Sequence, residues 1–118
     1  MKVFAATTAG VTVGTVSWNV TYEDPSDSGI DVFAELYDAN GNVKYSRTVP
    51  CKPPYACPLV TDNVAQGSYT AGLAVGAARY YYNENLGIIS APNDSAQATI
   101  ILINSANLNP QIVIHVQP

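Results

Sequence analysis

Two cysteines carry the most specific chemistry in this chain. Cys51 and Cys57 lie in the segment PCKPPYACP, with proline on both outer flanks. A disulfide closing this small loop would stiffen a segment that its prolines already restrict; two free thiols are the alternative. Zinc is the weaker interpretation, because a zinc site takes about four ligands and the chain offers two Cys and one His. A bridge would indicate an oxidising compartment or the interior of a hyperthermophile.

Four carboxylates fall within residues 23–31 (EDPSDSGID), and oxygen ligands at such density can hold calcium. The candidate ligands are Glu23, Asp24, Asp27 and Asp31. A solvated turn is the alternative, because Pro, Ser and Gly form a turn without any ion. The sequence indicates no other cofactor.

Catalytic residues are scarce. His115 is the only histidine, and it lies in the apolar segment IVIHVQ. The chain has no G-x-S-x-G motif, and neither cysteine has a histidine partner suggested by the sequence. We therefore expect a non-enzymatic protein.

Consecutive tyrosines form the most suggestive candidate binding patch. In an extended strand Tyr80 and Tyr82 share one face and Tyr81 takes the other. Tyrosine gives a large contact area at low entropic cost, so we assign these residues to an interface with another subunit. Ordinary packing at a sheet edge and stacking on a glycan are the alternatives, and Tyr55 at the tip of the cysteine loop is a further candidate for the same roles.

The composition narrows the choice of partners. Only 12% of the 118 residues are charged, which is about half the usual share. Removing water from much of this surface should therefore cost little free energy. The net charge of −4, with five Lys and Arg in total, argues against nucleic acid and anionic membranes. No apolar run is long enough to span a membrane.

The arrangement of strands and turns predicts one all-β domain over residues 1–118, a two-sheet immunoglobulin-like sandwich of about 7–9 strands. Residues 11–22 alternate in two phases, which predicts a bulge at Gly14–Thr15 where the strand switches faces. Trp18 is the strongest core candidate. Further strands are expected at 30–37, 42–49, 59–60, 67–77, 79–82, 86–90, 100–103 and 112–116.

The last two expected strands are apolar on both phases, so both of their faces should be covered. A partner subunit or the N-terminal segment would cover the outer face; core packing under loops is the alternative. We assign Ile101, Ile103, Val113 and His115 to a subunit interface on this pattern.

Two segments resemble prealbumin-like and related immunoglobulin-like modules of surface or virion proteins. Residues 33–43 (FAELYDANGNV) look like their strand–turn–strand, and residues 64–75 (VAQGSYTAGLAV) look like their G-x-Y strand, in which a tyrosine enters the core. The resemblance covers about a fifth of the chain and implies a non-enzymatic module.

These observations favour a structural or surface-decorating subunit of a virion or extracellular assembly, acting through contacts with itself or with other structural subunits. The start of the chain, MKVFAATTAG, lacks the long apolar region of a secretory signal. The virion surface and the extracellular or cell surface are the expected locations. An adhesion or carbohydrate-binding module that uses the tyrosines is the alternative.

Overall fold

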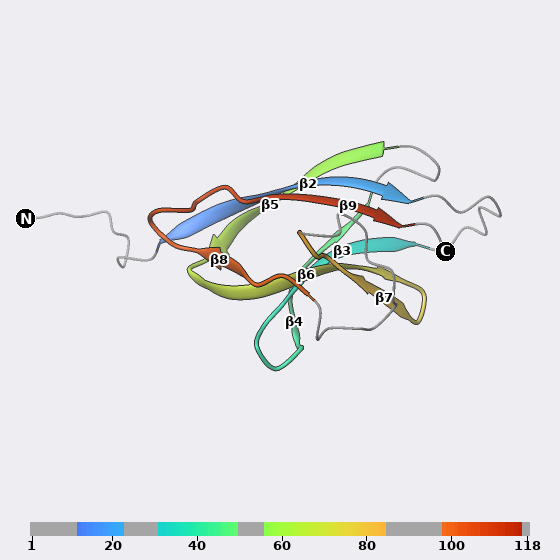
Figure 1. Cartoon of the computed structure of the whole chain (residues 1–118), viewed down its shortest axis with the longest axis horizontal. Helices are drawn as coiled ribbons and strands as arrows, with labels where there is room; N and C mark the ends of the chain where they lie inside the picture. The colour runs from blue at the N-terminus through green and yellow to red at the C-terminus, as the bar shows by residue number, and fades with distance from the viewer. Residues whose placement is uncertain (1–11, 23–30, 50–55, 85–97, 117–118) are drawn as a thin grey trace, which may run out of the picture.

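The computed structural model describes residues 12–22, 31–49, 56–84 and 98–116, in which eight strands form two facing sheets (Figure 1). The predicted all-β, two-sheet sandwich is confirmed. The strands are β2 (Val13–Tyr22), β3 (Val32–Tyr37), β4 (Val43–Thr48), β5 (Ala56–Ala65), β6 (Gly67–Val75), β7 (Ala78–Tyr81), β8 (Ile101–Ile103) and β9 (Gln111–Val116).

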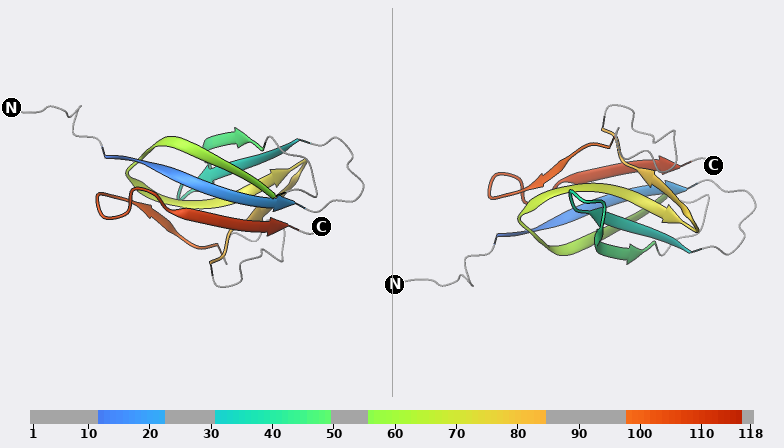
Figure 2. Two further views of the ribbon diagram at one scale, coloured as in Figure 1. Left: turned by 90° about the horizontal axis from the view of Figure 1, so that it is seen from above. Right: turned by 90° about the horizontal axis from the view of Figure 1, so that it is seen from below.

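One sheet has three strands in the order β5-β2-β9, and the other has five. Figure 2 shows the two sheets from opposite sides, with β2 between β5 and β9. In the five-stranded sheet the order is β4-β3-β6-β7, and β8 pairs with the first residues of β6, beyond the stretch that β7 occupies. Strand β2 is antiparallel to β5 and parallel to β9, so the last strand of the chain runs beside the first described one.

The predicted bulge near Gly14 exists, but the extra residue belongs to β5. Gly14 pairs with Val64 and Val16 with Thr61, so β5 spans one residue more than β2 at this point. Within that span Asn63 adopts a positive φ of 58°, a conformation that asparagine tolerates.

Strand β2 therefore keeps one phase, and the predicted switch of faces is wrong. Gly14 is buried, as are Val16 and Trp18 farther along. A Cβ at Gly14 would lie 2.7 Å from the backbone oxygen of Leu108, which is too close for a side chain. The glycine therefore allows the segment that precedes β9 to approach the backbone of β2. The same oxygen accepts a hydrogen bond from the N–H of Thr15 at 2.8 Å.

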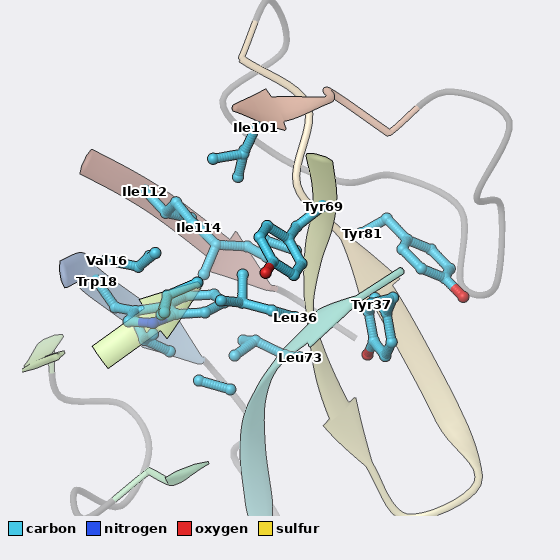
Figure 3. Close-up of a cluster of buried hydrophobic side chains, with 14 of the residues drawn as sticks. Val16, Trp18, Leu36, Tyr37, Tyr69, Leu73, Tyr81, Ile101, Ile112 and Ile114 are labelled. Carbon is cyan, nitrogen blue, oxygen red and sulfur yellow. The ribbon is translucent and has the colours of Figure 1, made fainter. Parts of the chain in front are cut away.

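The predicted core position of Trp18 is confirmed: 2% of its surface is exposed. Its indole N–H donates to the Thr61 hydroxyl on β5 at 3.0 Å, and Thr61 is itself buried. Leu36 and Leu73 from the opposite sheet point toward this tryptophan (Figure 3). The one polar atom of the indole is thus satisfied inside an otherwise apolar core.

Strands β5 and β6 pass from one sheet to the other with one residue between them, and two tyrosines fix this corner. The hydroxyl of Tyr69 donates to the backbone oxygen of Ala65 at 2.7 Å, four residues back, as in the tyrosine corner of immunoglobulin-like domains. The hydroxyl of Tyr45 accepts the N–H of the same alanine at 2.9 Å. The two rings pack edge to face with centroids 5.8 Å apart.

The hairpin turn between β3 and β4 also forms as predicted. Gly41 has a φ of 82°, which a tight turn requires and glycine readily adopts. The carboxylate of Asp38 accepts the N–H groups of Asn40 and Asn42 at 2.9 and 3.0 Å. These backbone hydrogen bonds, that of Asn42 above all, lower the pKa of Asp38.

Two expected strands require comment. The short strand expected at 59–60 is part of the ten-residue β5, which begins at Ala56 and reaches Ala65. Pro58 lies inside this strand, although a proline cannot donate a hydrogen bond to a partner strand. Pro58 is nevertheless accommodated because β5 is the outer strand of its sheet. The strand expected at 86–90 lies outside the described residues.

Replacing Thr61 by valine should lower the free energy of unfolding by about 1–3 kcal/mol, because the buried indole N–H loses its acceptor. Urea denaturation followed by tryptophan fluorescence measures the change. Thr48→Val, at an exposed position of β4, is the matched control. Equal stability of both variants would show that the Trp18–Thr61 bond contributes nothing measurable.

Alkaline pH should lower the contribution that Tyr69, at the β5–β6 corner, makes to the free energy of unfolding. Burial, and secondarily the contact with Tyr45, raise the pKa of Tyr69 from 10.0 to about 12. The folded state therefore retains this proton more tightly, and the resulting stabilisation is complete below pH 10 and lost as the pH rises through 12.

Tyr69→Phe should accordingly reduce the fall of the unfolding free energy between pH 10 and 12. Urea titrations at several pH values measure this slope, with Tyr80→Phe on β7 as the control. An unchanged slope in Tyr69→Phe would contradict the assigned pKa.

Candidate functional site

The outer face of the three-stranded sheet is hollowed into an open groove of about 510 Å³. Ser17 on the central strand lies between Val60 of β5 and Gln111 of β9, and Asn19 forms the next row. Small side chains on the middle strand and larger ones on the flanking strands produce the hollow. Its lining comprises Ser17, Trp18, Asn19, Pro58, Leu59, Val60, Gln111, Ile112 and Val113.

None of the described residues that line this groove is charged. Its two flanking valines are exposed, Val60 by 45% and Val113 by 56%. At one end the Ser17 hydroxyl donates to the side-chain oxygen of Asn109 at 2.9 Å, which ties the segment before β9 to the central strand. A neutral, partly apolar surface of this kind can be desolvated by a protein partner at low cost.

The predicted interface on the last strands divides between core and surface. Ile101 and Ile103 point inward and are 6% and 1% exposed, so they pack in the core and cannot be reached by a partner. The exposed apolar side chains nearby are Ile100 and Leu102, at 61% and 51%. The apolar pattern on both phases thus reflects one buried and one exposed face.

On β9, Val113 is exposed as the interface assignment requires, whereas Ile112 and Ile114 are buried. His115 pairs in register with Thr21 of β2, and its side chain lies outside the described residues.

The three consecutive tyrosines do not form an exposed platform. Tyr80 and Tyr82 are half-buried and pack against the core. Tyr81 lies on the opposite side, as predicted, yet only 7% of its surface is exposed. None of the described aromatic side chains is fully exposed. Tyr55 lies outside the described residues.

Tyr81 belongs to a polar–aromatic cluster on the outer face of the five-stranded sheet. Its ring packs against Tyr37 with centroids 5.3 Å apart, and the Arg79 guanidinium lies 5.0 Å from the centre of the Tyr37 ring. The Tyr37 hydroxyl donates to Glu35 at 2.9 Å. Figure 3 shows Tyr37 and Tyr81 on the far side of β3 from Trp18.

Gly72 makes room for this cluster. A Cβ there would lie 2.6 Å from the backbone oxygen of Tyr80 and 3.3 Å from the Tyr37 ring. Burial above all, together with the hydrogen bond to Glu35, raises the pKa of Tyr37 far above its usual value. The hydroxyl is therefore a neutral donor at every physiological pH, and its partner is a side chain of the same cluster. Sequence alternation alone could not reveal this cluster, since its members come from β3, β6 and β7.

The remaining predicted sites lie mostly outside the described residues. Cys57 is buried at the start of β5, opposite Val20, but Cys51 is not described, so their disulfide stays a prediction. Of the calcium candidates only Asp31 is described, at an exposed position; Glu23, Asp24 and Asp27 are not. Calcium binding by this loop also stays a prediction.

Comparison with known proteins gives one structural likeness. No family model and no curated protein sequence matches this chain. The crystal structure of BcpA, the major pilin subunit of Bacillus cereus, is similar with a TM-score of 0.46 and 13% sequence identity. The alignment covers 90% of this chain and 30% of that one, so this chain spans less than a third of that pilin. In the part of this chain that the structure describes, no helix is long and apolar enough to cross a membrane.

Proposed function

We propose that this protein is a non-enzymatic structural or surface-decorating subunit of an extracellular assembly, acting through protein–protein contacts. The observation that carries the proposal is the neutral groove on β5, β2 and β9, flanked by the exposed Val60 and Val113. The centres of protein interfaces are depleted of charge, and this face has that character.

The charge distribution supports the same proposal. Three titratable groups that interact with one another, Glu35, Tyr37 and Arg79, lie on the other sheet. Within the part of the chain that the structure describes, the groove lining includes no Asp, Glu, Lys or Arg. The groove is thus suited to contact, with polar side chains such as Asn19 and Gln111 available for hydrogen bonds.

The carbohydrate-binding alternative has less support. Sugar stacking needs an aromatic face open to the ligand, and Tyr81 is buried while Tyr80 and Tyr82 are half-buried. The proposal also includes the setting, an extracellular, cell or virion surface, and the low charge of the chain supports it.

A charge placed in the groove should prevent assembly without unfolding the domain. Val113→Glu should give smaller species than the wild type, because a desolvated carboxylate without a partner is costly at an interface. Light scattering coupled to size exclusion measures the molar mass across concentration, and circular dichroism checks the fold.

Val43→Glu is the control, because Val43 is an exposed valine, at 40%, on β4 of the other sheet. Assembly of Val113→Glu that matches the control would remove the groove from the proposal. A wild-type protein that forms no complex with itself or with co-expressed structural proteins would contradict the proposed function.

A further inference from the structure

The edges of the two sheets differ in how well they are protected against pairing with another strand. Natural proteins block such edges with charges, prolines, bulges or very short strands. Strand β4 carries Lys44 and Arg47 at exposed positions. Strand β5 carries Pro58, Asp62 and the bulge at Asn63. Strands β7 and β8 are four and three residues long and share one side of β6.

Strand β9 has none of these devices. It is six residues long, QIVIHV, and contains no acidic residue, lysine, arginine or proline. Among the described residues it pairs with β2 alone, so its other edge has no partner strand there. The residue with the exposed apolar side chain, Val113, lies near the middle of this edge.

The hydrogen bonds to β2 determine which backbone groups point to the open edge. The N–H of Ser17 donates to the backbone oxygen of Pro110 at 3.0 Å. In a parallel pair the bonding residues alternate along each strand, so the groups of Ile112 and Ile114 also face β2. Those of Gln111, Val113 and His115 therefore face away from it.

We infer that the β9 edges of two copies of this chain pair antiparallel across a twofold axis, with Val113 opposite Val113 of the second copy. The inference rests on the proposed function and names a second copy of this chain as the partner. A twofold contact must be self-complementary. A register centred on Val113 meets this requirement, because each residue pair on one side of the axis is repeated on the other side. It places Gln111 opposite His115 and Ile112 opposite Ile114.

This register satisfies both the backbone and the side chains. Residues with outward-facing backbone groups oppose one another, so each such pair can exchange two hydrogen bonds. The buried Ile112 and Ile114 fall on the same side in both copies and would continue the inner face of the sheet. No charged side chain of β9 opposes its own copy, whereas self-pairing of β4 would bring Lys44 and Arg47 of two copies together.

Replacement of Val113 by proline tests the pairing at the backbone. Proline removes the N–H that faces the open edge and leaves the bonds of Ile112 and Ile114 to β2 in place. Val60→Pro is the matched control. Val60 lies opposite Ser17, whose N–H bonds toward β9, so its own N–H faces the outer edge of β5.

Sedimentation equilibrium should show wild-type and Val60→Pro dimers, and dimerisation weakened by about tenfold or more in Val113→Pro. Equal dimerisation of all three proteins would overturn the pairing while leaving the proposed function intact. A wild-type chain that stays monomeric at every concentration, as when its own residues 1–11 occupy the edge, would also overturn it.

A cysteine variant keeps the test decisive if the proline variant fails to fold. Opposed residues in the proposed register have Cα atoms about 5.5 Å apart, which lies within disulfide range. Val113→Cys should yield a covalent dimer under mild oxidation, one that reductant separates, and Val60→Cys should not. Failure of Val113→Cys to cross-link, or equal cross-linking of both variants, would overturn the inference.

Discussion

The double pairing of β2 is the constraint on which the rest of the structure depends. Alternate residues of this strand bond to β5 on one side and to β9 on the other. The same alternation sends Val16, Trp18 and Val20 into the core and leaves Ser17 and Asn19 on the outer face. Core, groove and the open edge of β9 therefore follow from the position of one strand, and a change of its register by one residue would reverse both faces.

The corner between β5 and β6 connects this sheet to the other. Ala65 is held there at both backbone groups, by the hydroxyls of Tyr45 and Tyr69. On the far side, Tyr37 and Tyr81 cover the outer face of the five-stranded sheet around Gly72. Most of the described aromatic side chains thus pack within the sandwich, and the three-stranded face carries the groove.

The sequence predicted what alternation can encode and missed what depends on contacts between distant strands. It identified the sandwich and the burial of Trp18, because period-two patterns separate inner from outer positions. The entry of Tyr69 into the core was implied by the resemblance of residues 64–75 to the G-x-Y strand of immunoglobulin-like modules. The parallel pairing of β2 with β9 was not predicted, since periodicity carries no information about register or partner. For the same reason the burial of Tyr81 was not predicted: its ring packs against Tyr37 on β3, a strand far from it in the sequence.

Amide hydrogen exchange on β9 tests the central claim most directly, because it reports on single backbone groups of the unmodified protein. In dilute protein, Ile112 and Ile114 should be protected by β2, and the amides of Gln111, Val113 and His115 should exchange fast. As the protein concentration rises, our account predicts growing protection of these three amides while the Val60 amide stays unprotected. Fast exchange of all three at every concentration, or their protection already in dilute monomer, would contradict it.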